Sequence, residues 1–260
     1  LNADGTVKEQ TVSNWLHSDS GFQNFQDVSR LSDITNLKGS ETPQQSGTNL
    51  VWNAEANDIY YQGKTEQTPP ISAKIVYMLD GKEIAAKDLT GKSGHVKIEI
   101  SLINNEHHSV TANGKKYDVV TPFATVVGAS LPSDTFTNIK AEHGTVQTDA
   151  SNQLVGFVCL PGVKESFDGL LTGKLSQFGN YLLDTVVIEA DTKNCTVPTV
   201  MFACATDASK LTEEKGLSEF EDLQGNLDKL TDAVKQLQEG AEQLFGGAAK
   251  LDEGADTLKS

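Results

Sequence analysis

The sequence predicts a mainly β protein with an antiparallel, sandwich-like fold in two subdomains, followed by a long C-terminal α-helix that carries coiled-coil heptads. Three observations predict this fold class. Short runs alternate between apolar and polar residues as far as about Thr206, turn residues separate those runs, and beyond Thr206 leucines recur every seven residues. The expected domains are an N-terminal β subdomain over 1–68, a second β-sandwich subdomain over 69–206 and a heptad-repeat helix over 207–260.

Alternation of period two is the evidence for strands. In the run 96–102, four apolar residues alternate with polar ones. Because successive side chains of a strand point to opposite faces, this pattern is typical of a half-buried strand. The run 73–79 has the same pattern and leads into Asp80-Gly81. This pair tolerates the positive φ angles of a two-residue hairpin, so it predicts a turn.

Other short apolar runs predict further strands over 34–37, 49–54, 58–64, 109–112, 117–121, 136–141, 145–149, 153–160, 182–190 and 196–205. The last three runs are apolar on both faces in places, which predicts central positions in a sheet. Residues 13–32 fit a short helix or an ordered loop. No long amphipathic pattern interrupts the stretch before Thr206, so antiparallel sandwiches are favoured over parallel βαβ units. Thr68-Pro69-Pro70 marks the expected joint, because proline fixes φ and resists regular pairing.

The C-terminal segment carries the heptads. Leucines lie seven residues apart from Leu223 to Leu258, and the second apolar position follows four residues after each of the first five, which is the seam spacing of a coiled coil. The residues expected to form the oligomerisation seam are Leu223, Leu230, Leu237, Gly240, Ala241, Leu244, Gly247, Ala248, Leu251, Gly254, Ala255 and Leu258. Each glycine costs about 1 kcal/mol in a helix interior, so the repeated Gly-Ala pair predicts a closely approaching partner helix, from a second copy or a chain of the same family. The alternative is that 217–258 packs on the β domain as an ordinary terminal helix.

The Leu-x-x-Gly-Ala heptads resemble the repeats of Gram-positive cell-surface proteins of the phage infection protein type. They also resemble uncharacterised clostridial proteins that join a β-rich ectodomain to many such heptads and a membrane anchor. Segments 58–63, 79–84 and 89–94 are similar to parts of those ectodomains. The resemblance implies an extracellular or cell-surface location, with membrane anchoring only through segments outside this chain. It implies no catalytic residues.

Composition excludes one class of partner. The chain has 36 acidic and 21 basic residues, a net charge of −15, and a single arginine, Arg30. Because phosphate contacts need clustered Lys and Arg, we expect no nucleic-acid partner. No run of 18 apolar residues is present in the sequence, so none of it is expected to span a membrane.

Three functions remain. The first is a non-catalytic surface scaffold or adhesion-type ectodomain joined to a coiled-coil stalk. The second is a glycan- or protein-binding module for a cell-surface or host ligand, with Trp52, Tyr60 and Tyr61 as an aromatic platform. The alternative for these rings is that Trp52 and Tyr60 share a core face. The third is a hydrolase, which rests only on the abundance of carboxylates.

No metal site or cofactor is expected. The only histidine pair, His107-His108, is interpreted as part of a polar hairpin loop, because adjacent strand side chains point to opposite faces and do not readily share a metal. The cysteines Cys159, Cys195 and Cys204 lie in or beside apolar runs and are expected to be buried, inert thiols. Cys195 and Cys204 flank one strand length, so we expect no disulfide between them.

Overall fold

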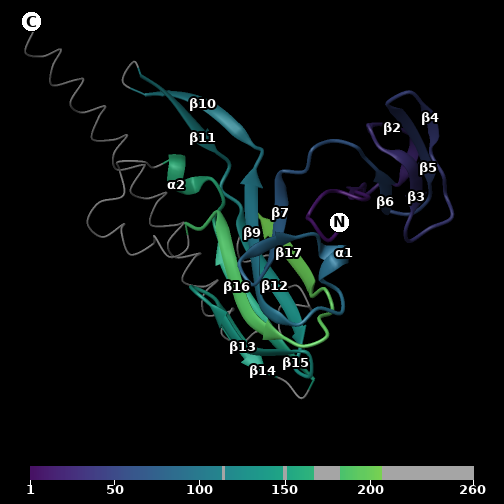
Figure 1. Cartoon of the computed structure of the whole chain (residues 1–260). Helices are drawn as coiled ribbons and strands as arrows, with labels where there is room; N and C mark the ends of the chain where they lie inside the picture. The colour runs from purple at the N-terminus through teal and green to yellow at the C-terminus, as the bar shows by residue number, and fades with distance from the viewer. Residues whose placement is uncertain (113–114, 149–150, 167–181, 207–260) are drawn as a thin grey trace, which may run out of the picture. The chain divides into compact units, whose positions relative to one another are not determined.

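The structure is a computed structural model that describes residues 1–112, 115–148, 151–166 and 182–206 (Figure 1). These residues are mainly β, with 59% of them in strands that form several antiparallel sheets. The chain divides into two compact units, Leu1–Pro69 and Pro70–Ser260. The first unit thus ends at Pro69, within the Thr68-Pro69-Pro70 segment.

Six strands build the first unit. They are β1 (Thr11–His17), β2 (Phe22–Val28), β3 (Ser32–Asn36), β4 (Gln44–Ser46), β5 (Asn49–Ala54) and β6 (Asp58–Lys64). The strands form two three-stranded sheets with the orders β1-β6-β3 and β2-β5-β4. β6 and β5 are therefore the central strands, and β1 lies at an edge.

Both sheets of the first unit contribute to one small core. Its buried apolar residues are Phe22, Leu31, Leu50, Trp52, Ala54, Ile59 and Tyr61. On β5 and β6 these residues are two positions apart, because only every second side chain of a strand faces the core. Trp52 and Tyr61 meet across that core with their ring centroids 5.2 Å apart.

The second unit contains two larger sheets. β7 (Ile71–Leu79), β8 (Lys82–Ile84), β9 (Gly94–Asn104), β13 (Phe136–Ala141) and β16 (Thr185–Thr192) form a sheet of order β13-β16-β9-β7-β8. β12 (Ala124–Pro132), β14 (Thr145–Thr148), β15 (Asn152–Cys159) and β17 (Thr199–Ala205) form a sheet of order β14-β15-β12-β17. β10 (His107–Ala112) and β11 (Lys115–Val120) pair with each other as a separate hairpin.

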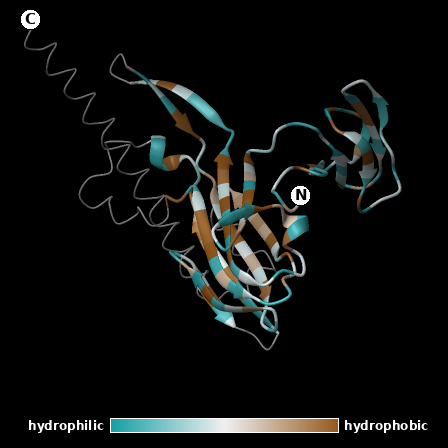
Figure 2. Cartoon of the chain, viewed as in Figure 1, coloured by the Kyte–Doolittle hydropathy of each residue, from teal (hydrophilic) through white to brown (hydrophobic). Residues whose placement is uncertain are grey.

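The two larger sheets share a single core. Val96, Ile98 and Ile100 from β9 belong to the same buried cluster as Val127 from β12 and Phe157 from β15. Figure 2 shows the corresponding bands of apolar residues along the strands of both sheets. The turn predicted at Asp80-Gly81 is confirmed, because both residues have positive φ, 50° and 78°, and the flanking β7 and β8 pair.

The expected long C-terminal helix is the main correction to the fold class. The described residues contain only two short helices, α1 (Ala86–Leu89) and α2 (Val163–Ser166), and no helix of seven residues or more. The segment 207–260 lies outside the described residues. A heptad pattern places apolar side chains on one side of a helix if a helix forms, but most helical stability comes from packing against a partner. Neither α1 nor α2 could span a membrane, since each has only four residues.

Several strand predictions also need correction. The segment 13–32 was expected to form a helix or a loop, but most of it lies in β1 and β2. Polar residues predominate in both strands, so the two-residue alternation typical of a strand is not evident in their sequence. β12 was not predicted, because six successive residues of it are buried and the pattern does not alternate. The strand expected over 196–205 begins only at Thr199, and as β17 it lies at a sheet edge rather than in a centre.

Candidate functional site

An exposed group of side chains lies on the outer face of the sheet β1-β6-β3. Along β1, Val12, Asn14 and Leu16 are half-buried, whereas the alternate residues, including Trp15 and His17, are exposed. Trp15 is 62% exposed, although it is one of only two tryptophans in the chain. A large, open indole on a sheet face is informative, because most tryptophans are largely buried.

Strand pairing brings β6 side chains beside this tryptophan. β1 and β6 are antiparallel, with Trp15 opposite Tyr60 and His17 opposite Asp58. Side chains directly opposite each other share a face, so all four project outward together. The Trp15 and Tyr60 rings are nearly parallel, at an interplanar angle of 7°, with centroids 6.0 Å apart. We call these four residues together with Lys38 the Trp15 surface.

Hydrogen bonds hold the indole ring in place. The Trp15 Nε1–H donates to Asp58 Oδ1 at 2.7 Å. The same oxygen lies 2.8 Å from His17 Nδ1, and His17 Nε2 lies 3.2 Å from Asp19 Oδ1. The Trp15 ring therefore leans from the edge strand onto the central strand, with its one polar atom satisfied and a large part of the ring left to solvent.

Lys38 is the fifth residue of the Trp15 surface. It follows β3, and the backbone N–H of Leu37 donates to the Tyr60 carbonyl at 2.6 Å, which fixes the start of this segment against β6. The Lys38 Nζ atom lies 3.6 Å from the centroid of the Tyr60 ring. A cation over a tyrosine face is attracted by the ring quadrupole, so Tyr60 is contacted by Trp15 and by Lys38.

The charges of the Trp15 surface compensate one another. The hydrogen bonds that His17 donates to Asp58 and then to Asp19 raise its pKa above the usual value. The pKa of Asp58 is lowered by the hydrogen bonds from His17 and then from Trp15, and the positive charges of His17 and Lys38 act in the same direction. Asp58 is thus an ionised acceptor at neutral pH beside an exposed aromatic ring.

The predicted aromatic platform is only partly present. Trp52 and Tyr61 are 0% and 1% exposed, so neither is open to a ligand. The Tyr61 hydroxyl donates to Asp27 Oδ2 at 2.7 Å, and burial is the main cause of its raised pKa. Tyr60 is half-buried and belongs to the opposite, outer face. The expectation that Trp52 and Tyr60 share a core face is wrong, because Tyr61 is the partner of Trp52.

Sequence reasoning missed Trp15 and Lys38. A weak signal for Trp15 is present in 11–17, because Val12 and Leu16 are four residues apart and would share one face of a strand, which leaves Trp15 and His17 on the other face. Lys38 has no local signal, because its position over Tyr60 depends on the pairing of β3 with β6.

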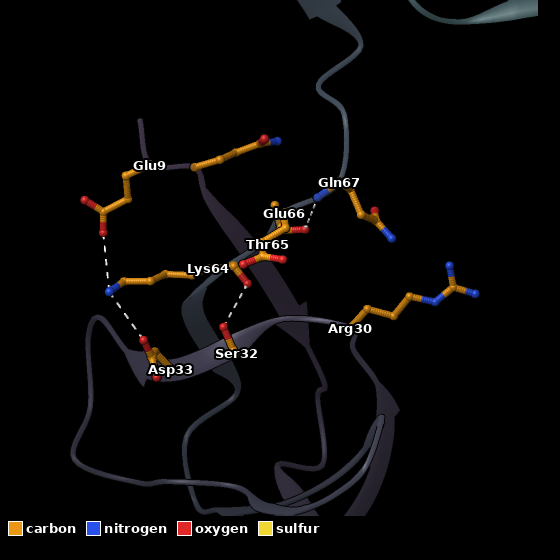
Figure 3. A pocket seen from close by; sticks show the side chains of 9 residues that line it. Glu9, Arg30, Ser32, Asp33, Lys64, Thr65, Glu66 and Gln67 are labelled. Carbon is orange, nitrogen blue, oxygen red and sulfur yellow. Dashed lines mark hydrogen bonds and ion pairs between the residues drawn. The ribbon is translucent and has the colours of Figure 1, made fainter. Parts of the chain in front are cut away.

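An open polar pocket lies elsewhere in the first unit (Figure 3). It has a volume of about 700 Å³ and is lined by Glu9, Gln10, Arg30, Ser32, Asp33, Lys64, Thr65, Glu66 and Gln67. Lys64 Nζ lies 3.4 Å from Glu9 and 3.3 Å from Asp33, and the hydrogen bonds that it donates to Asp33 and then to Glu9 raise its pKa. Ligand pockets are usually enclosed and largely apolar, so this open pocket of mixed charge is the weaker candidate.

The remaining polar candidates do not form a metal centre. His107 and His108 lie in β10 rather than in a loop, and their rings bond to different groups, the Asn104 carbonyl and the Thr121 hydroxyl. Within the described parts of the chain, no group of three or more His, Cys, Asp or Glu side chains is placed to hold a metal ion.

All three thiols are free, in agreement with the prediction that Cys195 and Cys204 are not bonded. Cys159 and Cys195 are buried as predicted, and burial raises the pKa of Cys159 to about 12. Cys204 is exposed, which corrects the expectation that it is buried, because β17 lies at a sheet edge. The heptad residues from Leu223 to Leu258 lie outside the described residues.

Comparisons of the chain with protein-family models, with curated proteins and with solved structures find no match. Among the described residues, the Trp15 surface is the feature whose geometry most strongly indicates a function.

Proposed function

We propose that this chain is a non-catalytic, adhesion-type ectodomain of the bacterial cell surface, and that its first unit binds a ligand through the Trp15 surface. One observation carries the proposal: a tryptophan that is 62% exposed is held in a single orientation by a stacked tyrosine and a carboxylate. Rigid exposed aromatic rings are typical of binding surfaces, because they bury much apolar area at little cost in conformational entropy.

The hydrogen bonding of His17 supports a non-catalytic role for this surface. A histidine that acts as a general base for a nucleophile needs one ring nitrogen for that nucleophile and the other for an orienting carboxylate. Both nitrogens of His17 instead bond to carboxylates, those of Asp58 and Asp19. This arrangement favours the protonated ring, which serves to orient Asp58.

The proposed location is the outside of a Gram-positive cell. Its support is the similarity of the segments 58–63, 79–84 and 89–94 to the ectodomains of Gram-positive surface proteins. The first of these segments is part of β6 and contains Asp58 and Tyr60, so it forms the centre of the Trp15 surface. We infer that any membrane anchoring is provided by segments outside this chain.

Binding to cell surfaces tests the proposal. We expect the fluorescently labelled full chain to bind intact Gram-positive cells or cultured animal cells in flow cytometry. Replacing Trp15 by alanine should reduce binding about tenfold or more, equivalent to about 1.4 kcal/mol or more, because truncation of an aromatic anchor typically costs more than about 1 kcal/mol. The control is Tyr117→Ala, which removes a 44% exposed aromatic ring from the second unit. Equal binding by both variants and the wild type, or no binding to any cell, would contradict the proposal.

A further inference from the structure

The Trp15 surface offers a ligand an apolar ring beside a charged oxygen. The only polar atom of the indole, Nε1, is satisfied by Asp58, so the exposed part of the ring is apolar. Both hydrogen bonds that Asp58 accepts from Trp15 and His17 end on Oδ1. Its second oxygen, Oδ2, takes part in no hydrogen bond among the described residues, and the side chain is 42% exposed. An acceptor therefore lies at the rim of the ring.

An apolar ring beside a charged acceptor matches the chemistry of a sugar ring, which has an apolar face and a polar rim. One face of a pyranose is a patch of C–H groups, which packs on an aromatic surface, and its rim carries hydroxyl groups that donate hydrogen bonds. An ionised carboxylate is the stronger kind of acceptor for a hydroxyl, with O–H···O⁻ distances of about 2.5–2.7 Å. Since Trp15 and Asp58 are already held by each other and by His17, little ordering is needed when such a ligand binds.

The charges on the surface argue against a cationic ligand. Asp58 by itself would attract one, but His17 donates to it and Lys38 lies 3.6 Å from the ring of the neighbouring Tyr60. These two side chains already supply positive charge at the positions that a cation would need. The net negative charge of the first unit excludes a nucleic acid, because this unit has nine acidic residues and only four basic ones.

The orientation of the indole argues against a protein partner that buries the Trp15 side chain in a pocket. Hot-spot tryptophans of protein interfaces insert into a pocket of the partner. Trp15 is instead held within its own sheet, parallel to the Tyr60 ring and hydrogen-bonded to Asp58, so it is less free to insert into a partner. The surface is also open, which suits a polymer that lies across it more than a small molecule that needs enclosure.

We propose that the Trp15 surface binds a saccharide, with the C–H face of one pyranose ring stacked on the Trp15 indole and one hydroxyl donating to Asp58 Oδ2. This inference rests on the proposed function, because it names the ligand class of the same surface. Its site consists of Trp15, Tyr60, Asp58 and His17, and Lys38 lies over the Tyr60 ring.

The test is direct binding to carbohydrates. The full chain is applied to an array of bacterial cell-wall and animal oligosaccharides, and each oligosaccharide that binds is titrated by calorimetry. We expect Trp15→Ala to weaken binding about tenfold and Trp15→Phe to weaken it less, because phenylalanine retains a ring but not the bond to Asp58. Asp58→Asn should weaken binding about fivefold, since a neutral amide oxygen is a poorer acceptor than a carboxylate. Tyr117→Ala should leave it unchanged.

Two further measurements identify the contact and the ligand class. Bound oligosaccharide should protect Trp15 fluorescence from acrylamide quenching, whereas Trp52 is already buried and should show no change. Affinity for a neutral oligosaccharide should be the same at low and high salt, because screening acts on charge–charge attraction. A strong loss of affinity at high salt would show that charge attraction dominates and would overturn the stacking account.

The outcomes separate this inference from the proposed function. If no oligosaccharide binds but cell binding still depends on Trp15, the surface binds another class of ligand, and only the saccharide proposal fails. If oligosaccharides bind equally well to the wild type and to Trp15→Ala, the proposed site is wrong. If cell binding is absent or independent of Trp15, the proposed function itself fails. Circular dichroism of each variant shows that the fold is retained, as expected for replacements on an exposed face.

Discussion

The two units of this chain are built from the same kind of sheet but differ in what their side chains do. The first unit has a core of seven buried apolar residues, three of them the aromatic residues Phe22, Trp52 and Tyr61. In the second, 19 described residues form the buried cluster, most of them aliphatic. A small core needs large rings to fill the space between its sheets, whereas a large core can be filled by many Val, Ile and Leu side chains.

This difference shows how a small unit divides its aromatic residues between a buried core and an exposed surface. Aromatic side chains bury about 150–250 Å² each, so a few of them stabilise a small core. The first unit places Trp52 and Tyr61 inside and leaves Trp15 outside, next to the half-buried Tyr60. The two tryptophans of the chain are thus a matched pair, of the same residue type in the same unit, with opposite exposure.

The largest expected effect is the loss of stability when the buried tryptophan, rather than the exposed one, is replaced. Replacing Trp52 by alanine should destabilise the first unit by about 3–5 kcal/mol, because it removes the largest side chain of a small core. Trp15→Ala should cost about 1 kcal/mol or less, the contribution of one exposed aromatic pair. Hydrogen exchange followed by mass spectrometry, resolved by segment, measures both effects. We expect Trp52→Ala to increase exchange over 1–69 and to leave the second unit protected.

Two results would contradict the comparison. Equal destabilisation by the two tryptophan variants would mean that Trp15 is as important to the core as Trp52. A loss of protection in β9 and β16 after Trp52→Ala would mean that the two units unfold together rather than separately.

A smaller effect is expected at Gly63, where β3 and β6 approach closely. A Cβ atom at this position would lie 2.7 Å from Leu31 Cβ and 2.8 Å from the backbone oxygen of Ser32. Since backbone cannot rotate away as a side-chain end does, Gly63→Ala should cost about 1–3 kcal/mol. Urea unfolding monitored by tryptophan fluorescence measures this loss. Gln62→Ala, on the outer face of the same strand, is the control and should change stability by less than about 0.5 kcal/mol.

The smallest expected effect concerns pH. His17 should titrate above its ordinary pKa of 6.5 in NMR, mainly because of Asp58 and then because of Asp19. A group whose pKa is raised by folding contributes stability that is fully present below the unfolded pKa and is lost as pH rises through the folded pKa. We therefore expect the His17 contribution below about pH 6.5 and its loss above that range. Asp58→Asn should lower the pKa of His17 more than Asp19→Asn does, and the reverse order would contradict the assigned contacts.

Local pattern was enough to predict much of the second unit. The alternation in 73–79 and 96–102 predicted β7 and β9, because a strand with one covered face must repeat its apolar side chains every second residue. The Asp80-Gly81 turn was predicted for an equally local reason, its positive φ angles. β12 was not predicted, because burial on both faces removes the alternation of apolar and polar residues. β1 and β2 were not predicted, because polar residues predominate in them.

Once 58–64 forms a strand, Tyr60 and Tyr61 must face opposite sides of it, because adjacent strand residues always do, and this much follows from their order in the chain. Which of the two tyrosines faces out depends on how the strand packs in the folded unit. The pairing of β6 with β1 and β3 buries Ile59 and Tyr61 against Trp52 and places Tyr60 beside Trp15. A shift of register by one residue would exchange the two tyrosines without changing the local pattern. The Trp15 surface therefore depends on contacts between residues far apart in the chain, which a local pattern of apolar and polar residues does not reveal.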